Sequence, residues 1–316
     1  MPHPRNTGRP LNPDWFTPVR INRPAADRLA ATLTARRSPK AAHQAAFLLN
    51  AIRCMDLTTL SGDDTPDRVA RLCTKARRPL SEGIVSRLGL AAMPTVGAVC
   101  VYPTMVAPAV RALANSGIAV ASVATGFPAG LMPLDLRLAE IRYSVDQGAT
   151  EIDIVITRAH VFCANWSALY DELAAMREAC GDAHMKAILA TGDLATLKNV
   201  YDASMVAMQA GADFIKTSTG KEAVNATLPV SLVMLRAIRD FGAHTSHRVG
   251  FKPAGGMKTA KDAIAWQILI QEELGPDWLE PDLFRLGASS MLGDIERQLD
   301  HHVTGRYSAA HRHALA

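Results

Sequence analysis

The sequence of 316 residues predicts an α/β protein, a (β/α)8 TIM barrel with an N-terminal extension. Three observations indicate this fold. Eight short apolar stretches alternate with amphipathic helical stretches, which is the pattern of βαβ units in a parallel sheet. Two helical stretches end at a glycine just before a strand, at Gly148 and Gly211, where a helix C-terminus favours glycine. Hydrophobic residues make up 48% of the chain, enough for a large core, and α/β barrels often fold about 250 residues as one domain.

The expected strands and helices alternate regularly from about residue 41 onward. Strands are predicted at Cys54–Leu57, Val96–Tyr102, Ala119–Ala124, Glu151–Ile156, Met185–Ala190, Asp213–Thr217, Val249–Lys252 and Phe284–Gly287. Helices are predicted around Val69–Ala76, Ala107–Ala114, Leu134–Val145, Leu169–Ala179, Leu197–Met208, Val230–Phe241, Ala260–Glu273 and Leu292–His301. A doubly wound open sheet is the structural alternative. That fold favours a glycine-rich loop after the first strand, and the sequence has none there.

The first forty residues are rich in proline and arginine and hold the excess positive charge. The chain carries 34 basic and 30 acidic side chains, a formal charge of +4. Eight basic and two acidic side chains give residues 1–40 a charge of +6, which leaves −2 for residues 41–316. We predict an arm over 1–40 that ends in a short helix near Ala25–Ala35, a catalytic barrel over 41–303 and a C-terminal tail over 304–316. A nucleic-acid-binding domain carries its basic charge on the folded body, so we expect no nucleic-acid partner.

Cysteine usage and hydropathy indicate a cytoplasmic protein. The five cysteines are scattered and form no CxxC pair, which is typical of reduced thiols rather than of a disulfide framework or a zinc module. The first residues contain no apolar segment, so we expect no secretion signal. The uncharged stretch Leu88–Val110 is long enough to cross a bilayer. Its three prolines and its β-rich segment Val96–Tyr102 favour a buried strand followed by a loop, so we expect no membrane contact.

Ionisable residues inside apolar strands are the first indication of chemistry. They are Asp56, Asp153, Lys186, Lys216 and Lys252. Burying an isolated charge is costly, so such groups normally pair or shift their pKa. A structural ion-pair network accounts equally well for any one of them. Together, however, three lysines against two aspartates leave one cation uncompensated, and a nearby like charge lowers the pKa of a lysine. A neutral lysine attacks carbonyl groups and forms a Schiff base.

Three loops of small residues lie late in the chain and indicate an anion site. They cover Thr217–Lys221, Pro253–Gly256 and Gly287–Ser290, each directly after a predicted strand. Barrels often bind phosphate with the loops after strands 7 and 8 and with a helix N-terminus, and glycine lets backbone N–H groups approach an anion. Glycine and serine are also ordinary turn residues. Three such loops in consecutive units, beside the lysines, predict phosphate binding.

Other catalytic signatures are missing from the sequence. The ten histidines form no HExxH arrangement, and no Walker motif or GxSxG elbow occurs. We therefore expect neither a metal ion nor an organic cofactor.

At these residues the sequence resembles the deoxyribose-phosphate aldolases, a family of class I, Schiff-base-forming aldolases with a (β/α)8 barrel. The resemblance covers roughly residues 45–300, in the family's order. It rests on the runs Met55–Leu60, Glu151–Val155, Ala212–Lys221, Val224–Thr227, Gly250–Gly256 and Arg285–Ser290.

The resemblance implies a role for each matching residue. Lys216 would form the Schiff base, Lys252 would lower the pKa of Lys216, and Asp153 would relay protons with Lys252. Asp56 and Thr58 would line the sugar-hydroxyl side of the site. Further substrate contacts are expected from Lys186, Thr219, Gly220, Lys221, Gly255, Gly256, Gly287, Ser289 and Ser290. The implied reaction is reversible cleavage of 2-deoxy-D-ribose 5-phosphate to D-glyceraldehyde 3-phosphate and acetaldehyde, within deoxyribonucleotide catabolism.

Two features depart from the short bacterial members of this family. Several of those members end in a tyrosine that reaches the active site, whereas here nine residues follow Tyr307. The N-terminal arm is also longer, and the overall length is similar to that of animal-like members.

One alternative is a transaldolase or another Schiff-base aldolase on the same barrel. A second is a non-catalytic phosphosugar-binding or scaffold protein that uses the basic arm as a partner contact. A further expected partner is a second copy of this chain, in a homo-oligomer.

Overall fold

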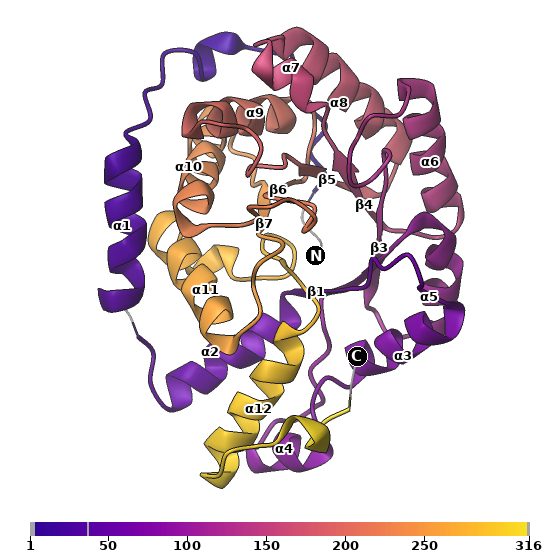
Figure 1. Cartoon of the computed structure of the whole chain (residues 1–316), viewed down its shortest axis with the longest axis vertical. Helices are drawn as coiled ribbons and strands as arrows, with labels where there is room; N and C mark the ends of the chain where they lie inside the picture. Colours follow the sequence, from indigo (N-terminus) through magenta and orange to yellow (C-terminus); the bar gives the residue numbers. More distant parts are fainter. Residues whose placement is uncertain (1–3, 37, 315–316) are drawn as a thin grey trace.

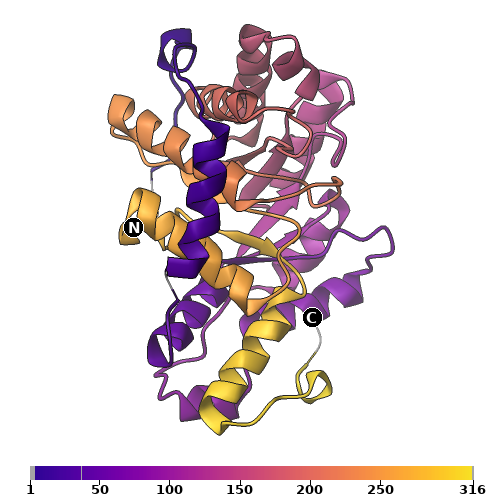
Figure 2. The ribbon, with the colours of Figure 1, turned by 60° about the vertical axis from the view of Figure 1, so that its left-hand side comes forward.

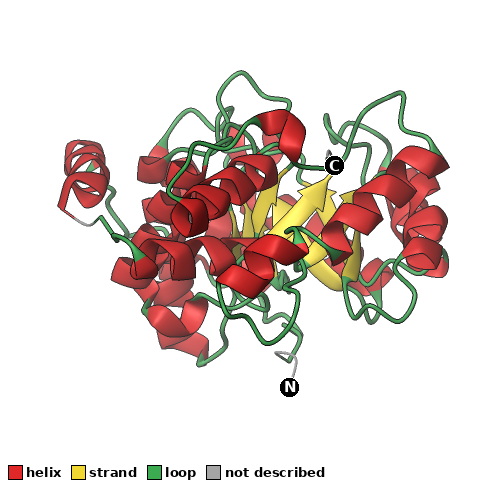
Figure 3. Ribbon diagram, turned by 90° about the horizontal axis from the view of Figure 1, so that it is seen from below, coloured by secondary structure: helices red, strands yellow, loops and turns green. Residues whose placement is uncertain are grey.

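The computed structural model describes residues 4–36 and 38–314, and its centre is one sheet of eight parallel strands. The sheet order is β7-β6-β5-β4-β3-β2-β1-β8, and bridges from Phe251 to Phe284 and from Ala254 to Gly287 join its two edges. The helices follow one another around the strands in chain order (Figure 1), and the strands occupy the centre (Figure 3). The predicted (β/α)8 barrel is confirmed, and the open sheet is excluded. The strands are β1 Met55–Thr58, β2 Ala98–Val101, β3 Ala119–Val123, β4 Glu151–Val155, β5 His184–Ile188, β6 Phe214–Lys216, β7 Gly250–Lys252 and β8 Leu286–Ala288.

All of the predicted helices are present, and the structure adds several that the sequence analysis missed. The predicted ones are α1 Arg23–Arg36, α3 Pro66–Arg77, α5 Val106–Ala112, α6 Leu134–Asp146, α8 Trp166–Cys180, α9 Leu197–Gln209, α10 Leu228–Thr245, α11 Ala260–Leu274 and α12 Met291–Thr304. The added ones are α2 Ala42–Arg53, α4 Glu82–Arg87, α7 Arg158–Phe162 and the 3-10 turns Pro13–Trp15, Pro103–Met105, Pro276–Trp278 and Ala310–Arg312. With six and five residues, α4 and α7 are too short for hydrophobic periodicity to reveal.

Side-chain caps determine where several helices begin. The hydroxyl of Thr65 accepts a hydrogen bond from the backbone N–H of Arg68 at the start of α3. At the start of α11, Thr259 and Asp262 form a reciprocal capping box. Such caps contribute about 1 kcal/mol each. The α11 cap follows directly on the loop after β7, so it also helps to fix that loop at the edge of the barrel.

The strand register places the ionisable residues at two neighbouring levels of the barrel interior. Asp153 on β4 is paired with Lys186 on β5. Lys216 on β6 is paired with Ile188, which follows Lys186 by two residues on β5. Lys252 on β7 is paired with Lys216 and therefore lies at the same level. This stagger follows from the tilt that closes a parallel barrel. It brings residues far apart in sequence to one place and keeps Lys216 and Lys252 above Lys186.

The N-terminal arm packs against the barrel instead of extending away from it. Asn6 is buried; its backbone N–H donates to Asp213 Oδ1 at 2.8 Å and its Nδ2 donates to the carbonyls of Met208 and Ala212. Phe16 is fully buried and meets the ring of Trp166 edge-on. The helix α1 then lies across α10 and α11 (Figure 2). The arm therefore adds a layer over α8 to α11.

The boundaries of the arm, barrel and tail remain our proposal. Residues 1–3 and 37 of the predicted arm, and 315–316 of the predicted tail, lie outside the described residues. The stretch Leu88–Val110 forms β2 and most of α5, as a strand followed by a loop and a helix. In the described part of the chain, no helix is long and apolar enough to cross a membrane.

We expect Phe16→Ala to destabilise the protein by about 3–5 kcal/mol, because it removes a fully buried aromatic ring from the contact between arm and barrel. Urea titration followed by circular dichroism measures the free energy of unfolding. Arg20→Ala is the matched control, since Arg20 lies on the same arm with an exposed side chain. Equal stability of the two variants would show that the arm does not support the fold.

Candidate active site

A cavity of about 410 Å³ opens at the carboxyl ends of the strands, the face on which TIM barrels carry their active sites. Lys216 at the end of β6 and Lys252 at the end of β7 lie on its wall. Nine of the predicted substrate-binding residues line the same cavity: Thr58, Thr219, Gly220, Lys221, Gly255, Gly256, Gly287, Ser289 and Ser290. Loops from four different strands thus meet where the sequence analysis expected one site.

The carboxylate of Asp153 joins the two lysines of the cavity wall. Its Oδ2 accepts a hydrogen bond from Lys216 Nζ at 2.7 Å and another from Lys252 Nζ at 2.7 Å. Lys252 also donates to Asp56 Oδ2. Lys216 is 3% exposed, and the other three side chains are fully buried. One carboxylate oxygen therefore lies between two amines of the cavity wall, although Asp153 itself is buried and does not line the cavity.

Burial lowers the pKa of Lys216 below its usual value of 10.5. Asp153 opposes this effect, and the nearby ammonium of Lys252 adds to it. The predicted effect of Lys252 is thus present, but desolvation is the larger cause. A lysine with a lowered pKa holds a larger fraction of the nucleophilic free amine near neutral pH.

The neighbours of Lys216 remain charged. Although burial alone would lower the pKa of Lys252, the carboxylates of Asp153 and Asp56 raise it above its usual value. Burial alone would raise the pKa of Asp153, but Lys186, Lys216 and Lys252 hold it well below its usual range. The site therefore combines an amine whose pKa is lowered with an ammonium and a carboxylate whose charged forms are stabilised by their neighbours.

The structure places Asp56 and Lys186 away from the cavity wall, although the sequence analysis assigned both to substrate contacts. Each side chain is fully buried. Lys186 Nζ lies 2.6 Å from Glu151 Oε2, 2.9 Å from Asp153 Oδ1 and 3.6 Å from Asp56 Oδ2. The reason is the stagger of the strands, which puts Lys186 one level below Lys216. These two residues support the catalytic groups from beneath.

Two residues of the buried cluster were missed, namely Glu151 and Arg285. The guanidinium of Arg285 donates to both oxygens of Glu151, at 3.1 and 2.7 Å, and to Asp56 Oδ1 at 2.6 Å. A signal for Glu151 was present, because residues two apart on a strand face the same side and Glu151 precedes Asp153 by two. A signal for Arg285 was present as well, because it is a charged residue inside the predicted strand Phe284–Gly287.

The loop after β6 already holds an anion of its own. The carboxylate of Glu222 accepts hydrogen bonds from the backbone N–H groups of Thr219, at 3.0 Å, and Gly220, at 3.1 Å. Lys221 Nζ reaches across to the carbonyl of Leu60 in the loop after β1, at 3.1 Å. One of the predicted phosphate donors, the N–H of Gly220, is therefore occupied in this structure.

The loops after β7 and β8 require glycine. Gly255 has a φ of +76°, and a Cβ there would lie 2.7 Å from the side chain of Asn225. A Cβ on Gly287 would lie 2.9 Å from the Cβ of Ala254 and 3.2 Å from Lys252 Cε. Gly287 thus lets β8 approach Lys252 closely.

Tyr307 lies outside the cavity. Its side chain is 94% exposed and stacks on His301 with ring centroids 5.0 Å apart. Within the described residues, no group of three or more His, Cys, Asp or Glu side chains is arranged to hold a metal ion.

Comparisons with known proteins identify the family. The family model "DeoC/LacD family aldolase" matches residues 50–271. The deoxyribose-phosphate aldolase of Homo sapiens is 57% identical over 309 residues, covering 97% of each chain. That of Mus musculus is 58% identical over 307 residues, covering 96% of each chain.

Solved structures share the fold at low sequence identity. A putative deoxyribose-phosphate aldolase from Toxoplasma gondii superposes with a TM-score of 0.70 at 20% identity, covering 85% of this chain and 97% of that one. One from Coccidioides immitis gives 0.64 at 22% identity, covering 88% and 98%. The resemblance drawn from the sequence motifs is thus confirmed, and the chain belongs to the DeoC/LacD family of aldolases.

Proposed function

We propose that this aldolase cleaves 2-deoxy-D-ribose 5-phosphate reversibly to D-glyceraldehyde 3-phosphate and acetaldehyde through a Schiff base on Lys216. The observation that carries the proposal is the Asp153 oxygen shared by Lys216 and Lys252, two lysines on the wall of a cavity that is also lined by glycine and serine loops. Relatives that are 57–58% identical over nearly the whole chain have the same activity in their names.

The reaction begins with attack of the neutral Lys216 amine on C1 of the open-chain sugar. The carbinolamine loses water to give an iminium ion. The electron pair of the C2–C3 bond then moves toward the iminium nitrogen, while the C3 hydroxyl loses its proton and becomes the aldehyde of glyceraldehyde 3-phosphate. The remaining enamine takes up a proton at C2, and hydrolysis releases acetaldehyde and restores the amine.

Asp153 and Lys252 are suited to move these protons. Asp153 Oδ2 lies 2.7 Å from both lysine nitrogens, so a proton that leaves Lys216 has an acceptor within hydrogen-bond distance. The Lys252 ammonium next to it supplies positive charge where oxygen atoms become negative. We assign Lys216 as nucleophile and the Asp153–Lys252 pair as the proton relay.

Another part of the cavity wall is suited to the phosphate of the substrate. Backbone N–H groups of the loops after β7 and β8, and the N-terminus of α12, lie there together with Ser289 and Ser290. Arg68, Lys221 and Lys258 add three cations to the wall. We assign the 5-phosphate to this side and the sugar hydroxyls to the side of Thr58.

We further propose that the enzyme works in the cytoplasm, in deoxyribonucleotide catabolism, as a homo-oligomer. All five cysteines are free thiols in the structure, which suits a reducing compartment. Two exposed side chains, Leu131 just before α6 and Leu136 in its first turn, offer apolar surface for self-association. Light scattering on the purified protein measures the oligomeric state.

Borohydride reduction in the presence of acetaldehyde is expected to leave an ethyl group on Lys216, located by peptide mass spectrometry. Lys216→Met should lose more than about 10⁴-fold in kcat, the scale of losing a covalent nucleophile. Lys261→Met, an exposed lysine on α11, is the control and should retain full activity. An unlabelled Lys216 would overturn the mechanism, and preference for dihydroxyacetone donors over acetaldehyde would redirect the proposal to another Schiff-base aldolase.

The pH dependence of kcat/KM should show an acidic limb with its midpoint below 10.5, because activity is lost as Lys216 takes up a proton. In Asp153→Asn this limb should move to lower pH, since Asp153 raises the pKa of Lys216. The same variant should lose about 10²–10⁴-fold in kcat through loss of the proton relay. A limb that moves to higher pH would contradict the assignment.

Glu222→Gln should lower KM for 2-deoxyribose 5-phosphate by about fivefold, which corresponds to ~1 kcal/mol of charge repulsion beside the phosphate. The KM for unphosphorylated 2-deoxyribose should stay constant, because this sugar has no phosphate that the Glu222 carboxylate could repel at the N–H of Gly220. Steady-state kinetics with both sugars make the comparison, with Glu178→Gln on the exposed face of α8 as control. Equal changes in KM for both sugars would show that the phosphate does not bind beside Gly220.

A further inference from the structure

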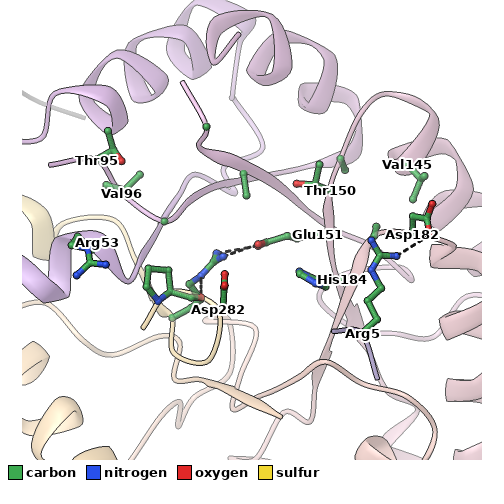
Figure 4. A pocket seen from close by; sticks show the side chains of 17 residues that line it. Arg5, Arg53, Thr95, Val96, Val145, Thr150, Glu151, Asp182, His184 and Asp282 are labelled. Atoms are coloured by element: carbon green, nitrogen blue, oxygen red, sulfur yellow. Dashed lines mark hydrogen bonds and ion pairs between the residues drawn. The ribbon is translucent and has the colours of Figure 1, made fainter. Parts of the chain in front are cut away.

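A chain of buried ion pairs crosses the barrel from its amino end to Lys216. At the amino ends of the strands lies a second cavity, of about 580 Å³, whose wall includes Glu151 and Arg285. In Figure 4, Glu151 points toward the middle of this cavity and takes part in an ion pair there. Neither residue lines the catalytic cavity at the opposite end.

The chain is continuous at hydrogen-bond distances. Arg285 holds Glu151 through two contacts and Asp56 Oδ1 through a third. The other oxygen of Asp56 accepts from Lys252. In parallel, Glu151 Oε2 accepts from Lys186 at 2.6 Å, and Lys186 donates to Asp153 Oδ1 at 2.9 Å. Asp56 and Asp153, the two carboxylates that contact Lys252 or Lys216, thus each accept a further hydrogen bond on their other oxygen.

The charge of this cluster depends on one proton. The cluster contains four cations, Lys186, Lys216, Lys252 and Arg285, and three carboxylates, Asp56, Glu151 and Asp153. With every group ionised its net charge is +1, and loss of the proton of Lys216 brings it to zero. Uncompensated charge is costly inside a protein, so this balance favours the neutral amine of Lys216.

We propose that Glu151 and Arg285 are positioning residues of the aldol reaction, which orient Asp153 and Lys252 through Lys186 and Asp56 and set the charge balance that favours the free amine of Lys216. This inference rests on the proposed function of Lys216. The charged and titratable groups that face Lys216 directly are Asp153 on β4, Lys252 on β7 and Cys100 on β2. Glu151 and Arg285 act on it through the first two.

Opposite shifts of the acidic limb of the kcat/KM pH profile in two variants test the proposal. Glu151→Gln removes a negative charge, so the acidic limb of kcat/KM should move to lower pH by about 0.5–1 unit. Arg285→Met removes a positive charge, and the limb should move to higher pH by a similar amount. The double variant restores the net charge and should return the limb close to its original position. A packing role alone would lower activity without moving the limb in opposite directions.

Conservative variants keep the test decisive if Arg285→Met does not fold. Arg285→Lys and Glu151→Asp retain the charges, so they should lose kcat through misplacement while the limb stays in place. The pH dependence of borohydride trapping with acetaldehyde gives the same limb without turnover. Limbs that stay fixed, or that move together, in the charge-removing variants overturn the proposal. Absence of trapping in the unmodified enzyme would instead overturn the Schiff-base mechanism itself.

Discussion

The site depends on the carboxylate of Asp153, which is shared by three lysines in the dry interior of the barrel. Its Oδ1 accepts from Lys186 and its Oδ2 accepts from Lys216 and Lys252. Three ammonium groups could not be buried side by side without such a partner, because desolvation and mutual repulsion would both oppose it. Removing this one carboxylate would take away a hydrogen-bond partner of Lys186, Lys216 and Lys252 at once.

The number of carboxylate partners explains why the three lysines behave differently. Lys186 has three carboxylates within 4.0 Å and Lys252 has two, and for both the pKa is raised. In the described chain Lys216 pairs only with Asp153, and burial then outweighs attraction, so its pKa is lowered. Position at the top of the cluster therefore leaves Lys216 with the fewest carboxylate partners of the three lysines. The same position gives Lys216 access to the cavity.

The two ends of the barrel divide stability and chemistry between them. At the carboxyl end, glycine loops line the cavity, and Glu222 accepts a hydrogen bond from the N–H of Gly220. At the amino end, Arg285 and Glu151 fix the base of the ion cluster. The basic arm packs on the outside through Asn6 and Phe16, so its positive charge accompanies a structural contact and not the catalytic cavity. The mildly acidic body noted from the composition still presents a cationic site.

The sequence by itself determined the barrel and its eight strands, and it drew attention to Asp153, Lys216 and Lys252 as ionisable residues inside apolar strands. It could do so because alternating apolar and amphipathic stretches are local patterns, and because a charge within an apolar strand stands out in the sequence. Only the tertiary structure decided the depth of each side chain. The stagger of the strands puts Lys186 one level below Lys216, and Asp56 is fully buried. Arg285 joins the cluster over a separation of 134 residues from Glu151. The packing of the arm through Asn6 was likewise beyond sequence reasoning, since its partners lie about 200 residues away and only the closed barrel brings them together.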